Sequence, residues 1–212
     1  MNTKNELDYC NNVCDLMSSN EIPEKIKLKL YLKVLELFSE KDFHQVNIRE
    51  IAKESGISVG TIYKYFTSKQ DLVFTVIDEY LSELNDLIRM HIQGIENPKE
   101  IFRKLFWVTM DFYDRNRGVA ITGFITVPTR NWMQKNAYRR DDIREVLGDI
   151  LEKVKKNNGI YPDMDVRTLN NLYFMFCNRH VHVWYYHGMK WNLADKISDF
   201  FELFWRIMEP RE

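Results

Sequence analysis

The segment from Asn47 to Phe66, NIREIAKESGISVGTIYKYF, restricts the fold more than any other part of this chain. Apolar residues recur in its first half at helical spacing, at Ile48, Ile51 and Ala52. Gly56 then stands where a helix ends with a positive φ, which glycine adopts without a Cβ clash. Ser58 can cap a second helix by accepting hydrogen bonds from its free N–H groups. Two short helices joined by a tight turn are the layout of a helix-turn-helix, whose second helix enters the DNA major groove.

The second helix of this segment has an apolar side and a side suited to binding. We expect three of its residues to pack inward, namely Val59, Ile62 and Phe66. Four hydroxyl, aromatic and basic residues remain, namely Thr61, Tyr63, Lys64 and Tyr65. These are more than solubility requires, although plain core packing also suits Tyr65.

A wider set of residues extends this pattern over three helices and the start of a fourth. The set comprises Leu37-Phe38, Ile51-Ala52, Gly56-Ile57-Ser58, Gly60-Thr61-Ile62-Tyr63, Tyr65-Phe66, Ser68-Lys69 and Leu72. Because of these residues and their spacing, the stretch from Ile26 to Tyr80 resembles the TetR family of bacterial transcription regulators. Lys33 stands where the family usually has a small residue, and Asp42 where it usually has glycine. Neither departure changes the expected fold, because Asp tolerates the left-handed conformation better than most residues.

The resemblance implies which residues contact DNA. Ser58, Tyr63 and Lys69 would hold phosphates, and Asn47 would act both as a helix cap and as a phosphate donor. Gly60 would let the recognition helix approach the DNA backbone closely. Two further side chains would reach base edges, namely Thr61 and Lys64, because Thr can touch a thymine methyl group and Lys can donate to guanine.

Composition indicates a soluble helical protein. The 212 residues are 45% hydrophobic and 29% charged, with only five prolines and eight glycines. No apolar run reaches membrane-spanning length and the N-terminus lacks a signal sequence, so we expect a cytoplasmic location and no membrane partner. The net charge of −1 does not by itself indicate a polyanion ligand, although residues 21–70 carry nine basic against seven acidic residues.

Helix start and stop signals divide the chain into three parts: an N-terminal extension (1–22), a helix-turn-helix DNA-binding domain (23–70), and a ligand-binding and dimerisation domain (71–212). The sequence predicts an all-α fold of about nine helices, with no confident strand. Besides the two motif helices, the expected ranges are 23–40, 68–93, 98–115, 118–127, 131–156 with a possible break near Arg139, from Asp163 or Asp165 to Gly188, and 192–210.

The cysteines and histidines leave two weak metal or redox alternatives. In the extension, Leu7, Cys10, Val13 or Cys14, and Met17 would form one face of an amphipathic helix, although a frayed tail is an equal alternative. Cys10 and Cys14 would share that face. Three residues of another helix would also share a face, namely Cys177, His180 and His187. Neither set includes a carboxylate at ligand spacing, so we predict no metal and no cofactor.

The last two predicted helices carry more apolar surface than one core needs. One stripe comprises Leu169, Leu172, Tyr173, Phe176 and Trp184, and the other Leu193, Ile197, Phe200, Phe201, Phe204 and Ile207. The family resemblance implies a homodimer formed by these helices, so we expect Leu193, Ile197, Phe200 and Phe204 to contact the partner. The alternative is that all of these side chains fill the monomer's core.

The resemblance also implies a ligand cavity in the C-terminal domain. The candidate lining residues are Phe106, Trp107, Met110, Tyr113, Phe124, Tyr173, Phe176, Cys177, His180 and Trp184. Arg115 and His180 are the candidate polar anchors. An aromatic content of 14% would suit an apolar or aromatic effector. Core packing is the simpler explanation for any single one of these side chains.

The sequence therefore predicts a DNA-binding transcription regulator that a small effector releases from a near-palindromic double-stranded operator. The family resemblance implies that this regulator is a repressor. The alternative is a DNA-binding protein of the same fold controlled by a protein partner or by DNA alone. An enzyme is disfavoured, because no nucleophile elbow, phosphate-binding glycine loop or placed carboxylate pair is recognisable in the sequence.

Overall fold

The computed structural model describes residues 22–134, 141–156 and 159–209, and within these ranges it contains helices and no strand. The all-α prediction is therefore confirmed. The α-helices are α2 (Glu24–Glu40), α3 (Ile48–Ser55), α4 (Val59–Tyr65), α5 (Lys69–Ile92), α6 (Pro98–Arg115), α7 (Arg117–Ile121), α8 (Thr129–Gln134), α9 (Asp141–Lys155), α10 (Val166–Tyr186) and α11 (Ser198–Met208). A π-helix, η1 (Thr122–Thr126), follows α7, and a 3-10 turn, η3 (Ala194–Lys196), precedes α11.

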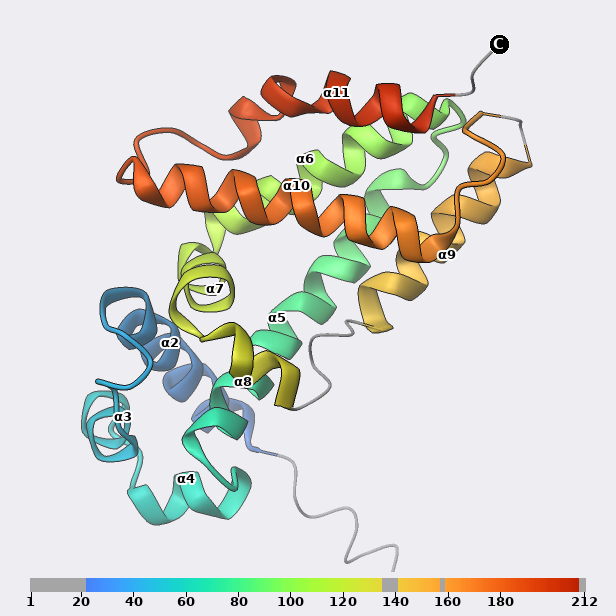
Figure 1. The fold of residues 1–212 in the computed structure, drawn as a ribbon. Helices are drawn as coiled ribbons and strands as arrows, with labels where there is room; N and C mark the ends of the chain where they lie inside the picture. Colours follow the sequence, from blue (N-terminus) through green and yellow to red (C-terminus); the bar gives the residue numbers. More distant parts are fainter. Residues whose placement is uncertain (1–21, 135–140, 157–158, 210–212) are drawn as a thin grey trace, which may run out of the picture.

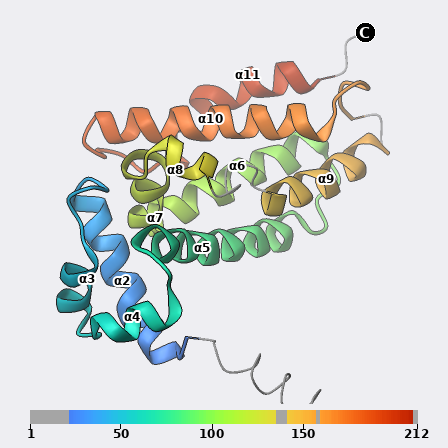
Figure 2. The ribbon, with the colours of Figure 1, turned by 60° about the horizontal axis from the view of Figure 1, so that its bottom comes forward.

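The first three described helices form a unit at one end of the molecule, and α10 and α11 lie at the opposite end (Figures 1 and 2). Leu30, Val34 and Phe38 recur every four residues on α2 and are fully buried. They supply the centre around which α3 and α4 pack. The long helix α5 leaves this unit and passes into the C-terminal domain (Figure 1). Its 24 residues correspond to about 36 Å of helix, enough to join the two ends.

Side-chain caps begin several helices where the sequence predicts them. The Ser68 hydroxyl accepts a hydrogen bond from the Asp71 N–H at 3.0 Å, at the start of α5. At the start of α10, the Asp165 carboxylate accepts one from the Thr168 N–H at 2.6 Å. Of the two predicted caps for this helix, Asp165 is therefore the correct one. Its carboxyl pKa is lowered, first of all by this backbone hydrogen bond.

Three predicted helices differ in detail from the structure. The range 118–127 is divided between α7 and the π-helix η1, whose wider turn is closed by a hydrogen bond from the Val127 N–H to the Thr122 carbonyl at 3.1 Å. The range 131–156 contains two helices, α8 and α9, and the predicted break near Arg139 lies outside the described residues. The range 192–210 opens with the turn η3 before α11 begins. The N-terminal extension also lies almost wholly outside the described residues.

The structure corrects three of the four predicted dimer contacts. Leu193, Ile197 and Phe204 are buried within the monomer. Leu193 lies there because the Asp114 carboxylate of α6 accepts hydrogen bonds from the Leu193 N–H at 2.8 Å and from the next N–H at 3.0 Å. Phe204 packs against Phe106, with 4.8 Å between ring centroids. The monomer therefore uses these side chains as core, because α11 lies against α6 as well as α10.

The fourth predicted dimer contact, Phe200, is half-buried. Its ring stacks on Phe176 of α10 at 5.3 Å and meets His180 edge-on at 5.0 Å. These ring contacts fasten α11 to α10 within one chain. Phe200 therefore contributes mainly to the packing of the monomer.

Candidate nucleic-acid interface and ligand pocket

The turn between α3 and α4 has the geometry that the sequence predicts. The Asn47 side chain caps α3 by accepting from the Glu50 N–H at 3.0 Å. Gly56 has a φ of +67° and ends the helix. The Ser58 hydroxyl caps α4 by accepting from the Thr61 N–H at 3.0 Å. These local bonds fix the angle at which α4 leaves the turn.

The helix α4 presents a polar face to solvent. Ile62 is buried and Phe66, just after the helix, is also buried, so both pack inward as predicted. Tyr63 is 55% exposed, and Lys64 is exposed beside it. The Lys64 ammonium lies 5.3 Å from the centre of the Tyr65 ring, so that ring supports the lysine stem. Gly60 is exposed and carries no side chain to hold a DNA backbone away.

Lys69 lies elsewhere than the family resemblance implies. Its ammonium donates to the carbonyls of Phe43 at 2.5 Å and Val46 at 2.7 Å, both in the loop between α2 and α3. It also lies 4.4 Å from the centre of the Phe43 ring. Partial burial lowers the pKa of this ammonium. In this structure Lys69 ties the start of α5 to the helix-turn-helix through these two bonds, and its predicted phosphate contact stays a prediction.

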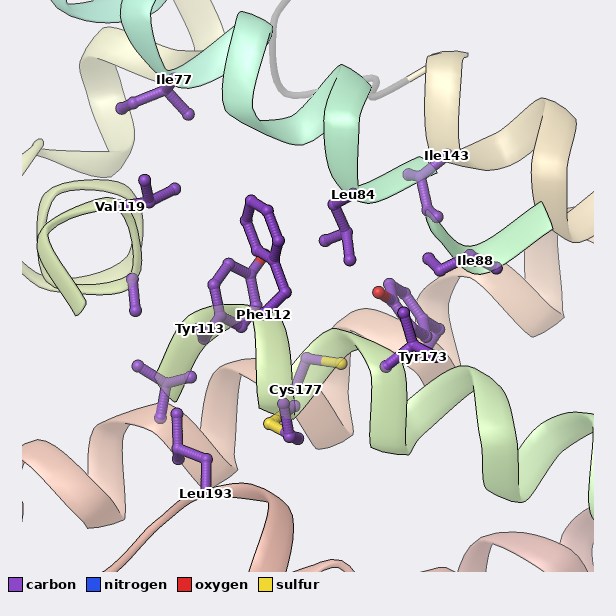
Figure 3. Packing of buried hydrophobic residues seen from close by; sticks show 14 of the residues in the cluster. Ile77, Leu84, Ile88, Phe112, Tyr113, Val119, Ile143, Tyr173, Cys177 and Leu193 are labelled. Carbon is purple, nitrogen blue, oxygen red and sulfur yellow. The ribbon is translucent and has the colours of Figure 1, made fainter. Parts of the chain in front are cut away.

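A pocket of about 630 Å³ lies in the C-terminal domain between α5, α6, α7, η1, α8, α9 and α10. Figure 3 shows Ile77 and Leu84 from α5, Val119 from α7 and Ile143 from α9 around the same interior as Tyr113 and Tyr173. Its lining residues are Ile77, Leu81, Leu84, Asn85, Tyr113, Val119, Gly123, Phe124, Val127, Thr129, Trp132, Ile143, Asn170, Asn171, Tyr173, Phe174, Met175, Asn178 and Arg179. This size is within the range of small-molecule sites.

The lining of the pocket is mainly apolar, and most of its polar residues lie on α10. Burial raises the pKa of the Tyr173 hydroxyl well above its usual value, and that hydroxyl shares a hydrogen bond with the Thr109 hydroxyl at 2.9 Å. Asn85 donates to the Asp142 carboxylate at 2.9 Å, which leaves the α5 wall mainly apolar. Arg179 and Asn178 line the pocket and are exposed, so this edge meets solvent. The arrangement suits an apolar ligand with a polar end.

Two walls of the pocket also hold α2 of the helix-turn-helix unit. On α5, Ile77 and Leu81 line the pocket, while Glu79 between them accepts from the Tyr31 hydroxyl at 2.7 Å and pairs with Lys27. On η1, the pocket-lining Phe124 is two residues from Thr126. The pocket is therefore connected to both halves of α2.

The contact between α2 and the segment from α7 to η1 is close. The Thr126 hydroxyl donates to the Phe38 carbonyl at 2.7 Å. A Cβ placed on Gly118 would lie only 3.0 Å from the Leu35 Cβ, so glycine allows α7 to approach α2 this closely. A movement of the pocket wall at η1 must therefore displace α2 or break this contact.

Comparison with known proteins places the helix-turn-helix in a family. Residues 34–76 match the family model of bacterial regulatory proteins, tetR family. The chain belongs to the TetR family of bacterial transcription regulators. As a TetR family member it is a DNA-binding regulator of transcription.

Relatives of this TetR family chain match it over different lengths. The fatty acid metabolism regulator protein of Bacillus subtilis is 25% identical over 190 residues, 84% of this chain and 95% of that protein. The regulator HbdR of Aromatoleum is 24% identical over 119 residues, so the chain spans about half, 52%, of that relative's length. The crystal structure of the Bacillus subtilis regulator FadR in complex with stearoyl-CoA has a TM-score of 0.75 at 21% identity, covering 84% of this chain and 96% of that chain.

The predicted pocket residues divide into two groups. Tyr113, Phe124 and Tyr173 line the pocket. Seven others do not: Phe106, Trp107, Met110, Phe176, Cys177, His180 and Trp184. Met110, Cys177 and Trp184 are buried in the core, and Trp107 is on the surface beside Lys104, at 4.7 Å. The candidate Phe106 is also core.

Neither predicted polar anchor reaches the pocket. The His180 ring nitrogen Nε2 hydrogen-bonds the Leu193 carbonyl at 3.0 Å, between α10 and the start of η3. Arg115 is exposed and pairs with Asp111 on its own helix at 2.9 Å. The residues that sequence reasoning missed include the α5 stripe Ile77, Leu81 and Leu84 and the α10 polar row Asn170, Asn171, Asn178 and Arg179. The α5 stripe has the three-and-four spacing that a search for a second apolar face would have found.

In the described ranges, no group of three or more His, Cys, Asp and Glu residues is placed to hold a metal ion. Cys177 is buried, and burial raises the pKa of its thiol. Among the same residues, no helix is both long and apolar enough to cross a membrane. Cys10 and Cys14 lie outside the described residues.

Proposed function

We propose that this chain is a dimeric transcription repressor that leaves its operator when the acyl chain of a fatty acyl-CoA enters the C-terminal pocket. The observation that supports it is a largely apolar pocket whose α5 and η1 walls also hold α2 of the DNA-binding unit. The Bacillus subtilis structure similar to this chain contains stearoyl-CoA, which supports the choice of ligand class. The exposed Arg179 at the edge of the pocket would attract the anionic CoA end.

In this proposal, α4 reads DNA. Ser58 and Tyr63 contact phosphates, helped by Asn47 and by the close approach at Gly60, while Thr61 and Lys64 contact base edges. Replacing Tyr63 with Ala should weaken binding to all duplexes alike. Replacing Lys64 with Ala should instead relax base preference at one position in each half-site, by about 1–3 kcal/mol of discrimination. Lys104→Ala, on α6 beside Trp107, is the matched charge control.

The dimer would form through the outer faces of α10 and α11. Leu203 is 60% exposed and Ile207 41% exposed on α11, and Met175 is exposed on the neighbouring α10. The helices α10 and α11 lie at the end of the molecule opposite α4 (Figure 1), so these exposed apolar side chains leave α4 free for DNA. A two-fold pair would present two α4 helices to one face of DNA, with half-sites about 34 Å apart and a near-palindromic operator.

Switching requires that the ligand prefers the form that cannot bind DNA, because equal affinity for both forms would shift nothing. An acyl chain that moves the α5 wall would act on α2 through Glu79, and one that moves η1 would act through Thr126. Each displacement changes the tilt of α2 and hence the spacing of the two α4 helices. A hundredfold preference corresponds to about 2.7 kcal/mol of coupling, within the usual allosteric range.

The test measures thermal stability and operator affinity with stearoyl-CoA, a medium-chain acyl-CoA and free CoA. We expect acyl-CoA to raise the melting temperature and release the operator, and free CoA to do neither. Gly123→Leu should abolish both effects, since a Cβ at Gly123 meets nothing within 4 Å and a longer side chain would enter the pocket. Gly148→Ala in α9, outside the pocket lining, is the control.

Three results would contradict the proposal. Stabilisation by acyl-CoA with unchanged operator affinity would separate the pocket from DNA binding. Operator release that persists in Gly123→Leu would place the ligand elsewhere. Absence of any ligand effect, with normal operator binding, would favour control by a protein partner.

A further inference from the structure

The wall of the C-terminal pocket includes two asparagine side chains whose oxygens lack a donor. Asn85 of α5 is only 5% exposed, and its Nδ2 donates to the Asp142 carboxylate at 2.9 Å. Because an ionised carboxylate only accepts hydrogen bonds, this contact fixes the amide and turns the Asn85 Oδ1 away from Asp142. No described residue donates to that oxygen. Asn170 of α10 also lines the pocket, and its Oδ1 is buried without a partner among the described residues.

Both asparagines lie at the end of the pocket next to α9. Asn85 is bonded to the first turn of that helix. A Cβ on Gly148 of α9 would lie 3.8 Å from Val166, and Asn170 follows Val166 by one turn of α10. Figures 1 and 2 show α9 beside this first half of α10. Arg179, at the exposed edge of the pocket, is nine residues further along α10, which corresponds to about 14 Å.

The buried hydroxyl of Tyr173 does not supply the missing donor. The Thr109 hydroxyl donates to the Leu105 carbonyl at 2.8 Å, so its proton is used. In the 2.9 Å bond between Thr109 and Tyr173, the tyrosine hydroxyl is therefore the donor. A buried acceptor without a donor costs free energy, and a ligand that brings a donor removes that cost.

We propose that the effector of this pocket carries a hydroxyl group beyond the middle of its chain, and that this hydroxyl donates to one of the two asparagine oxygens. The inference rests on the acyl-CoA function proposed above and names the class of acyl chain. With the CoA end at Arg179, the distance of about 14 Å brings carbons past the middle of a stearoyl chain to Asn85 and Asn170. A saturated chain fills the same space but leaves both oxygens unpaired. The preferred effector is therefore a hydroxyacyl-CoA.

The first test compares three ligands of the native chain by isothermal titration calorimetry. They are stearoyl-CoA and the same molecule hydroxylated at carbon 12 or at carbon 2. We expect 12-hydroxystearoyl-CoA to bind about fivefold or more tightly than the other two, because only its hydroxyl reaches the α9 end. In a pocket without a free acceptor, the extra hydroxyl would instead weaken binding, since burying it unpaired is costly. Equal or weaker binding of 12-hydroxystearoyl-CoA would therefore overturn the proposal.

The second test removes the asparagine oxygens. Asn85→Leu/Asn170→Leu should lose the preference for 12-hydroxystearoyl-CoA over stearoyl-CoA. Asn171→Leu/Asn178→Leu is the matched control at the exposed edge of the pocket, and it should keep the ratio of the two affinities whatever its effect on each. A preference that persists in the first variant, or disappears in the control, would overturn the assignment. The comparison of ligands in the native chain needs no variant and stands by itself.

The same ligands separate this inference from the proposed function. Operator release by stearoyl-CoA with no preference for 12-hydroxystearoyl-CoA would contradict the hydroxyl site and leave the acyl-CoA function in place. Preferred binding of 12-hydroxystearoyl-CoA with unchanged operator affinity would support the hydroxyl site and contradict the regulatory function. Binding of none of the three ligands would overturn both.

Discussion

Thr126→Val is the sharpest test of the connection between the pocket and the DNA-binding unit. Thr126 belongs to η1, and its hydroxyl donates to the Phe38 carbonyl at 2.7 Å. Phe38 lies in the last turn of α2, where carbonyls have no further helical N–H to accept. Valine keeps the shape of threonine but removes this donor, so the change is confined to one bond between η1 and α2.

The magnitude follows from the net contribution of one hydrogen bond, about 0.5–1.5 kcal/mol. If this bond transmits wall movement to α2, its loss should reduce the effector's influence on operator affinity by about twofold to tenfold. Ligand affinity itself should change little, because Thr126 is not among the pocket-lining residues. Thr75→Val is the control, since the Thr75 hydroxyl bonds the Asp71 carbonyl of its own helix at 2.9 Å.

The assay is fluorescence anisotropy of labelled operator, with and without saturating stearoyl-CoA, for the native chain and both variants. The quantity compared is the ratio of the two operator affinities. If the ratio of operator affinities without and with stearoyl-CoA is the same in Thr126→Val as in Thr75→Val, transmission through η1 is refuted. Transmission would then run through another contact with α2, such as the α5 link, where Tyr31 and Lys27 hold Glu79.

Three further predictions concern packing and assembly. Thr109→Val leaves the buried Tyr173 hydroxyl without its threonine partner and should lower the free energy of unfolding in urea by about 1–3 kcal/mol; a change near zero would contradict the described bond. Gly159→Ala places a Cβ only 2.2 Å from a ring atom of Pro98 and should lower the free energy of unfolding by about 1–3 kcal/mol. Gly148→Ala should instead raise it by about 0.5–1 kcal/mol, because alanine favours the helix α9. A change of the same sign in both variants would argue against this packing. Leu203→Glu should yield monomers in sedimentation, and an unshifted dimer would exclude α11 from the interface.

The sequence was sufficient for the features that depend on local chemistry. Gly56 and the caps at Asn47, Ser58 and Ser68 each act within four residues, and the structure has them as predicted. Helix boundaries marked by proline or glycine could also be predicted from the sequence, such as the start of α6 at Pro98. The helix-turn-helix is therefore nearly complete from sequence alone.

The pocket depended on how distant helices face each other, which a single sequence does not reveal. On α10, Cys177 and Trp184 point into the core, while Asn171 and Asn178, about a third of a turn round the helix, line the pocket. Which face is inside is decided by α5, α6 and α9, up to a hundred residues away. The position of Lys69 is a similar case, since its acceptors lie 23 and 26 residues earlier.

The division of α5 into two faces separates two evolutionary pressures. Ile77 and Leu81 meet whatever occupies the pocket, while Glu79 lies about 200° from Ile77 round the helix and keeps α2 attached. Substitutions at the first two positions alter which molecule is sensed without touching the attachment or α4. A lineage of such chains can therefore exchange its signal while keeping the same target genes.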